Sequence, residues 1–221
     1  MSAVPPPVLA IDGPGGSGKG TISQRLATRL GWHYLDSGAL YRVLGLAATR
    51  AGIALTDEAA LCDLIQTLQI RFEPGPIGEP ARVFLEDRDI SDTVRTEATG
   101  HLASQVAVLP GVRAALLALQ HAFRRPPGLV TDGRDMGTTV FPDAFLKVYL
   151  TASAAVRAER RYKQLKEKGL EATLGAVLGE ISQRDARDAE RTASPLKPAT
   201  DAWILDTSSL SIDEVVEVIH Q

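Results

Sequence analysis

A glycine-rich segment close to the start of the chain has the residue types that bind phosphate. Its residues are Gly13, Pro14, Gly15, Gly16, Ser17, Gly18, Lys19, Gly20 and Thr21. Glycines let several backbone N–H groups point toward one anion, and the N-terminus of a following helix adds partial positive charge. A lysine at this place supplies a cation for the β- and γ-phosphates of a nucleoside triphosphate. We therefore predict that the segment binds ATP.

The residues on either side match the context that a phosphate-binding loop requires. Before the loop, the apolar run Val8–Ile11 predicts a buried strand. After it, Ile22, Leu26 and Leu30 recur at helical spacing. Gly31 then predicts the end of that helix. A glycine-rich turn with an incidental lysine is the structural alternative, and the flanking strand and helix weigh against it.

Gly20 stands where the general pattern of these loops has Ser or Thr directly after the lysine. The hydroxyl that would bind Mg²⁺ from that position is therefore absent. Gly-Lys-Gly-Thr instead resembles the variant found in nucleoside monophosphate kinases. We expect Mg²⁺ to be the cofactor, held through phosphates and water without a direct protein ligand. Asp132 is a candidate to contact it through water, and capping a helix or bracing a loop is an equally open role for Asp132.

Two further polar segments follow strands that we predict at residues 32–35 and 128–132. They read Asp-Ser-Gly-Ala-Leu-Tyr-Arg at residues 36–42 and Asp-Gly-Arg-Asp-Met-Gly-Thr at residues 132–138. Each contains an arginine, Arg42 or Arg134, that can bind a phosphate oxyanion. The carboxyl ends of parallel strands are where α/β sheets place their ligands, so we expect a second anionic substrate beside the loop.

The elements that must position these segments are short apolar strands alternating with helices. This alternation predicts an α/β fold of the P-loop NTPase type, with three layers and a five-stranded parallel sheet. Further core strands are expected at residues 145–150 and 202–205, and a capping box at Ser211–Glu214 predicts a final helix. Residues 70–72 and 82–85 flank a Pro/Gly-rich turn, which predicts an antiparallel hairpin.

We divide the chain into a kinase-like core with two additions. The core covers about residues 7–65, 97–150 and 192–221, and a small β-rich insertion covers about 66–96. The likeness to nucleoside monophosphate kinases implies that this insertion binds the nucleoside monophosphate. A helical lid covers about 151–191. Four of its arginines are candidates to close over the transferred phosphoryl group: Arg157, Arg160, Arg161 and Arg187. A solvated helical hairpin held by salt bridges is the alternative for this segment.

The sequence resembles the bacterial cytidylate kinases. The motifs that carry the resemblance lie at residues 13–21, 36–42, 92–96, 103–107, 132–138 and 184–188, and it spans Val8 to about Val218. The resemblance implies transfer of a phosphoryl group from ATP to CMP or dCMP. It implies catalytic roles for Lys19, Arg42, Arg134 and Arg184.

The same resemblance implies which residues bind CMP. Ser104, Arg113, Asp135 and Arg191 would surround cytosine, Arg184 and Asp188 would lie near the sugar, and Ser37, Tyr41, Arg42 and Arg134 would line the phosphate region. The chemistry agrees, because a carboxylate accepts a hydrogen bond from the cytosine amino group and would repel the O4 of uracil. A kinase of UMP, AMP or a non-nucleotide acceptor, and a non-catalytic ATP-binding module, remain the alternatives.

Composition limits the other classes of function. The chain has 221 residues, a net charge of −3 and one cysteine, Cys62. The acidic balance disfavours nucleic acid as a partner, and a single cysteine excludes a disulfide framework. Residues 1–7 lack a basic region followed by a long apolar run, so we expect no secretory signal and no membrane partner. We expect a cytoplasmic monomer that acts on small molecules, with Cys62 and Trp203 in the core.

Overall fold

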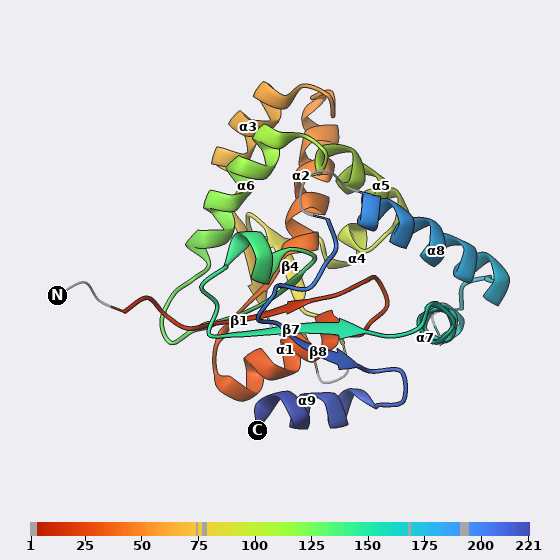
Figure 1. Ribbon diagram of the computed structural model, residues 1–221. Coiled ribbons are helices and arrows are strands. Elements are labelled where there is room, and N and C mark those ends of the chain that lie inside the picture. The colour runs from red at the N-terminus through yellow and green to blue at the C-terminus, as the bar shows by residue number, and fades with distance from the viewer. Residues whose placement is uncertain (1–3, 74, 77–78, 168, 191–194) are drawn as a thin grey trace.

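The central sheet of the computed structural model is parallel and has five strands. The structure describes residues 4–73, 75–76, 79–167, 169–190 and 195–221. In spatial order the strands are β2 (His33–Asp36), β6 (Leu129–Gly133), β1 (Val8–Asp12), β7 (Leu146–Thr151) and β8 (Trp203–Asp206). All four pairings between neighbours are parallel, which confirms the predicted fold class (Figure 1).

Both faces of the sheet are covered, and the side chains of β1 show how. Val8 and Ala10 belong to one core cluster, whereas Leu9 and Ile11 belong to the other. Successive residues of a strand point to opposite faces, so a strand buried on both sides must be apolar throughout. The short apolar run at the start of the sequence therefore forms the middle of a three-layer structure.

Different helices cover the two faces. α1 (Lys19–Leu30) and α9 (Ile212–His220) pack on the face that carries Leu9 and Ile11. The opposite face is covered by α2 (Ser37–Ala51), α3 (Glu58–Thr67) and α6 (Pro110–Ala122), and α5 (Glu97–Val106) packs on α2. α3 was not expected from the sequence, although Asp57 caps it and Leu61 and Ile65 are buried one turn apart. Cys62 is partly exposed and packs at the margin of this core.

A small antiparallel sheet packs on α2 beside the main sheet. It consists of β3 (Ile70–Glu73), β4 (Arg82–Leu85) and β5 (Arg88–Asp89), and the short helix α4 (Ser91–Val94) follows it. Ile70 pairs with Leu85 in an antiparallel register, which confirms the predicted hairpin. Val83, Ile90 and Val94 contact Ala39 and Val43 of α2. This third cluster attaches the small sheet to the helix that begins with the 36–42 motif.

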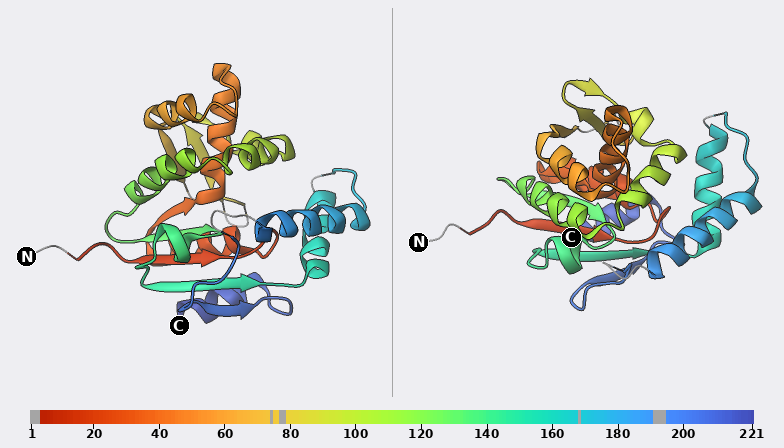
Figure 2. Two further views of the ribbon diagram at one scale, coloured as in Figure 1. Left: turned by 45° about the horizontal axis from the view of Figure 1, so that its top comes forward. Right: turned by 90° about the horizontal axis from the view of Figure 1, so that it is seen from above.

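Two helices project from the carboxyl end of the sheet. α7 (Ala154–Glu167) and α8 (Leu174–Glu190) pack against each other and lie on the side of the molecule opposite the N-terminus (Figures 1 and 2). Gly169, between them, has a φ of 70°. The segment predicted as a helical lid is thus a pair of helices, placed where β1 and β7 end.

Trp203 does not lie in the core, contrary to our expectation. β8 is the edge strand of the sheet, and Trp203 and Ile204 are 41% and 57% exposed. An apolar run of this length predicts a strand, but whether the strand is central or at the edge depends on its neighbours in space.

No single helix in the described ranges is long and apolar enough to cross a membrane. α5 and α6 taken together pass such a test of length and composition, with a bend of 108° between them. Within this pair, Val106, Val112 and Leu116 are fully buried in the core.

The capping box of α9 provides a test of the fold. The Ser211 hydroxyl accepts from the backbone N–H of Glu214, and the Glu214 carboxylate accepts from the backbone N–H of Ser211. We expect Ser211→Ala to lower the free energy of unfolding by about 1 kcal/mol. This loss corresponds to roughly 2–4 °C in Tm for a chain of this size, measured by thermal unfolding. Ser209→Ala, in the exposed loop before α9, is the control and should leave Tm unchanged. Equal shifts in Tm for both variants would contradict the stabilising role of the capping box.

Candidate active site

The glycine-rich loop leaves β1 at Asp12 and enters α1 at Lys19. Gly13 passes so close to β7 that a Cβ there would lie 2.3 Å from the Leu150 carbonyl oxygen. Gly18 precedes the helix with a φ of 87°, which favours glycine. Packing against the next strand and a left-handed turn therefore both require glycine here, and they aim the start of α1 into the loop.

Lys19 lies partly buried within this loop. Its Nζ donates to the Pro14 carbonyl oxygen at 3.1 Å. The pKa of Lys19 is lowered to about 7, mainly by burial and also by the nearby guanidiniums of Arg134 and Arg184, while Asp132 and Asp36 oppose the shift. An anion in the loop would reverse this balance, because it favours the charged amine.

Asp132 and Asp36 lie side by side at the ends of β6 and β2. Burial and the charge of Asp36 raise the pKa of Asp132 to about 7. The Tyr34 hydroxyl donates to Asp132 Oδ1 at 2.7 Å. The Tyr34 hydroxyl also lies beside Gly20, the residue after Lys19, because a Cβ on Gly20 would lie 3.8 Å from its oxygen. Asp36 is the residue that caps a helix, accepting from Ala39 N at 2.9 Å.

A pocket of about 170 Å³ lies beside the 132–138 motif. It is lined by Tyr41, Arg113, Ala114, Leu117, Gln120, Asp135, Thr139 and Val140. Arg113 Nη2 donates to Asp135 Oδ2 at 2.5 Å, and the Asp135 side chain is nearly buried. Three of the predicted CMP-binding residues thus line one pocket.

Gln120 lines the same pocket and is hydrogen-bonded to Ser37. The Ser37 hydroxyl donates to Gln120 Oε1 at 2.8 Å, and both residues are buried. Sequence reasoning missed Gln120, although a polar residue one turn after Leu116 on the buried face of α6 was the available signal. Ser104 lies on α5, and its hydroxyl donates to the Gly100 carbonyl oxygen at 3.0 Å. The residues that line the pocket do not include Ser104.

Arg42 is hydrogen-bonded to the backbone at the end of α4. Its Nη1 donates to the carbonyl oxygens of Val94 at 2.8 Å and Thr96 at 3.1 Å. Burial lowers the pKa of Arg42 below its usual value; the charge of Asp36 opposes this shift, and the charges of Arg161 and Arg134 add to it. Arg42 therefore lies in a field of other arginines, which suits a site for an anion.

Arg134 and Arg184 flank the phosphate-binding loop. A Cβ on Gly15 would lie 3.6 Å from both Arg134 Nη2 and Arg184 Cδ. Arg134 Nε also donates to Asp188 Oδ2 at 2.8 Å, and Asp188 is buried. This ion pair joins α8 to the 132–138 motif.

The predicted lid arginines have different surroundings. Arg157 is 4% exposed, donates to the Gly15 carbonyl oxygen at 3.0 Å, and forms a two-bond ion pair with Asp185. Arg160 donates to Thr207 in the loop after β8. Arg161 and Arg187 are exposed on α7 and α8. Arg191 lies outside the described residues.

Asp12 was not singled out by sequence reasoning. Its carboxylate is 5% exposed and accepts from Met136 N at 2.9 Å and Gly137 N at 2.8 Å. Burial raises the pKa of Asp12 to about 6, although the two hydrogen bonds oppose the shift. The sequence showed a strand ending in aspartate, and the partners of that aspartate lie in a segment that is distant along the chain.

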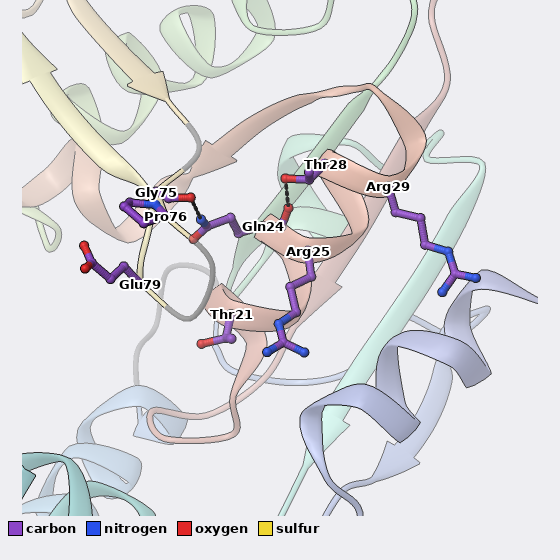
Figure 3. Close-up of a pocket in the computed structure, with 8 residues that line it drawn as sticks. All are labelled: Thr21, Gln24, Arg25, Thr28, Arg29, Gly75, Pro76 and Glu79. Atoms are coloured by element: carbon purple, nitrogen blue, oxygen red, sulfur yellow. Dashed lines mark hydrogen bonds between the residues drawn. The ribbon is translucent and has the colours of Figure 1, made fainter.

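A second pocket, of about 220 Å³, lies between α1 and the loop that joins β3 to β4 (Figure 3). Both arginines in its lining have acidic partners on α9, because Arg25 pairs with Asp213 and Arg29 pairs with Glu217. Gln24 Nε2 reaches the Gly75 carbonyl oxygen at 3.5 Å. The pocket shares Thr21 with the phosphate-binding loop but contains none of the predicted CMP-binding residues.

Comparisons with known proteins agree with this geometry. The family model described as cytidylate kinase matches residues 9–221. The cytidylate kinase of Nitrosococcus oceani is 58% identical over 96% of this chain and 94% of its own length, and that of Azotobacter vinelandii is 57% identical over 98% and 95%. A solved structure of an uncharacterized protein from Eubacterium ventriosum shares the fold, with a TM-score of 0.50, 10% identity and coverage of 97% and 96%. The chain therefore belongs to the cytidylate kinase family.

Proposed function

We propose that this protein transfers the γ-phosphoryl group of ATP to CMP or dCMP, giving ADP and CDP or dCDP. The observation that carries the proposal is that the loop with Lys19 and the pocket with Asp135 follow the neighbouring strands β1 and β6. Arg134 and Arg184 lie beside Gly15 of the loop. In the proposal, the donor site and the acceptor site share the carboxyl end of the sheet, and these two arginines supply positive charge there.

Recognition of the base is assigned to Asp135 and Arg113. A carboxylate can accept from the cytosine amino group, and a guanidinium can donate to N3 or O2. Uracil has an oxygen where cytosine has the amino group, so the carboxylate would face another acceptor. Leaving a buried polar group unpaired costs about 1–3 kcal/mol, which would favour CMP over UMP.

Transfer requires alignment and neutralisation of charge more than covalent chemistry from the protein. Lys19 would hold the β- and γ-phosphates, and Arg42 and Arg134 would hold the CMP phosphate in line. Arg184 would offset charge on the transferred group. No general base is needed, because the attacking phosphate oxygen is already anionic. The lid, about residues 151–191, and the insertion, about 66–96, would exclude water when they close.

The residues at the sheet edge fit Mg²⁺. Asp132 and Asp36 present carboxylate oxygens, which are the donors that this cation prefers. In the proposal Asp132 contacts it through water, with Tyr34 keeping the carboxylate in place. When bound, Mg²⁺ would supply positive charge to the phosphate oxygens of ATP. The proposal further includes a cytoplasmic monomer without nucleic acid or membrane partners. The net charge of −3 weighs against nucleic acid as a partner.

An acceptor panel tests the proposed reaction. ADP release should be fast with CMP and dCMP, and slower by about tenfold or more with UMP, because each 1.4 kcal/mol of discrimination is a factor of ten. AMP and shikimate should react least. Lys19→Ala should abolish turnover while the protein still unfolds cooperatively. Equal rates with CMP and AMP, or near-normal turnover by Lys19→Ala, would refute the assignment.

Asp135→Ala separates the acceptor site from the donor site. Removing the carboxylate should raise KM for CMP by roughly tenfold or more, as expected for loss of a charged hydrogen bond of about 1.5–3 kcal/mol. KM for ATP should change little, because Lys19 and the loop are untouched. Steady-state kinetics with each substrate varied in turn measures both values. Similar losses for the two substrates would remove Asp135 from the acceptor site.

The lowered pKa of Lys19 predicts uptake of a proton when nucleotide binds. At pH 8 the free amine, with a pKa of about 7, is largely neutral, and bound phosphate favours its charged form. Binding of ADP without divalent metal should therefore take up a proton, measured by calorimetry in two buffers of different ionisation enthalpy. Lys19→Arg is the control, because arginine is already charged at this pH. Equal uptake by both proteins would show that Lys19 is not the group.

A further inference from the structure

Asp135 stands directly before a single turn of π-helix, η1 (Met136–Val140). The first N–H groups of a helix have no partner within it, and an aspartate in this place usually accepts from them. The Asp135 side chain, however, makes no such capping hydrogen bond. Its carboxylate is instead directed to Arg113 in the proposed cytosine pocket.

Asp12, at the end of β1, supplies the missing cap. One of its carboxylate oxygens accepts from Met136 N and the other from Gly137 N, at 2.9 and 2.8 Å. Both donors and the carboxylate are buried. The two amides could not be left unpaired without a large cost, and water has little access to them.

We propose that Asp12 is a positioning residue for recognition of the acceptor base. By capping η1 from the neighbouring strand, it leaves the Asp135 carboxylate directed to Arg113 and to the base. If Asp12 could not accept, the two amides would be unpaired, and Asp135 directly precedes them at the N-cap position of η1. It would turn back to cap its own segment and leave the pocket. The inference rests on the proposed role of Asp135.

The position of Asp12 gives this role a second consequence. Asp12 is bonded to Gly13, the first residue of the phosphate-binding loop, so one residue ties the donor loop to the segment after Asp135. Hydrogen bonds of this kind keep the distance between the phosphate-binding loop and the acceptor pocket fixed. Transfer in line between two bound phosphates depends on such a separation.

Asp12→Asn is the principal test. Asparagine has the same shape but replaces one accepting oxygen with an amide NH₂, which cannot accept from Met136 or Gly137. The ratio of kcat/KM for CMP to that for UMP should fall about tenfold, the equivalent of 1.4 kcal/mol, while KM for ATP changes less than about twofold. An unchanged ratio would overturn the inference. If this variant does not fold, Asp12→Ser, which keeps one acceptor, is assayed with the same expectation.

Val216→Ala is the matched control for lost stability. Val216 is buried on α9 in the other core cluster, so truncation destabilises the fold without touching the acceptor pocket. Its CMP-to-UMP ratio should stay at the wild-type value. A fall equal to that of Asp12→Asn would mean that destabilisation alone reduces selectivity, and would overturn the inference.

Two measurements separate this inference from the proposed function. If Asp135→Asn keeps the preference for CMP, Asp135 does not read the base and the inference falls with it. If Asp135→Asn loses the preference, adding Asp12→Asn should reduce the ratio no further, because Asp12 acts through Asp135. A crystal structure of Asp12→Asn then decides on geometry alone: Asp135 turned toward the amides supports the inference, and Asp135 still bonded to Arg113 overturns it.

Discussion

The protein itself shields the ionisable groups of Lys19 and Asp132 from water, and this constraint shapes the rest of the site. Burial lowers the pKa of Lys19 and raises that of Asp132, so both approach 7. Placing these two groups there does not stabilise the folded state, because burial disfavours the charged form of each. The stability that keeps them in place comes from the two apolar clusters on either side of the sheet.

Internal carboxylates partner some of the arginines around the loop. Arg134 pairs with Asp188, and Arg157 pairs with Asp185, both acids lying one turn apart on α8. Each of these four side chains is less than a third exposed, so the pairs are only weakly screened by solvent. They join segments that are distant in sequence and fix the base of α8 against the phosphate-binding loop. In the proposed mechanism, the CMP phosphate competes with Asp188 for Arg134.

Sequence reasoning predicted the fold well where the signal was local. The apolar strand before the loop, the helix after it and the capping box of α9 each depend on residues within one element. It was wrong about Trp203, because β8 is the edge strand of the sheet, and the position of a strand in the sheet is not visible in its own sequence. It also omitted α3, although the Asp57 cap and the spacing of Leu61 and Ile65 were available as local signals, and the π-turn η1, which has only five residues.

The chemistry of the donor site follows from local sequence: a glycine-rich loop, a lysine and a glycine at the next position specify a phosphate site through backbone geometry and local charge. The class of fold follows from it too, because the period of apolar residues depends on the local element alone. Which side chains meet depends instead on tertiary packing. Asp12 caps η1, Tyr34 holds Asp132, and Arg157 bonds to the loop while Arg184 lies beside it. These contacts arise from the order of strands in the sheet and from the packing of α7 on α8, and no spacing along the chain encodes them.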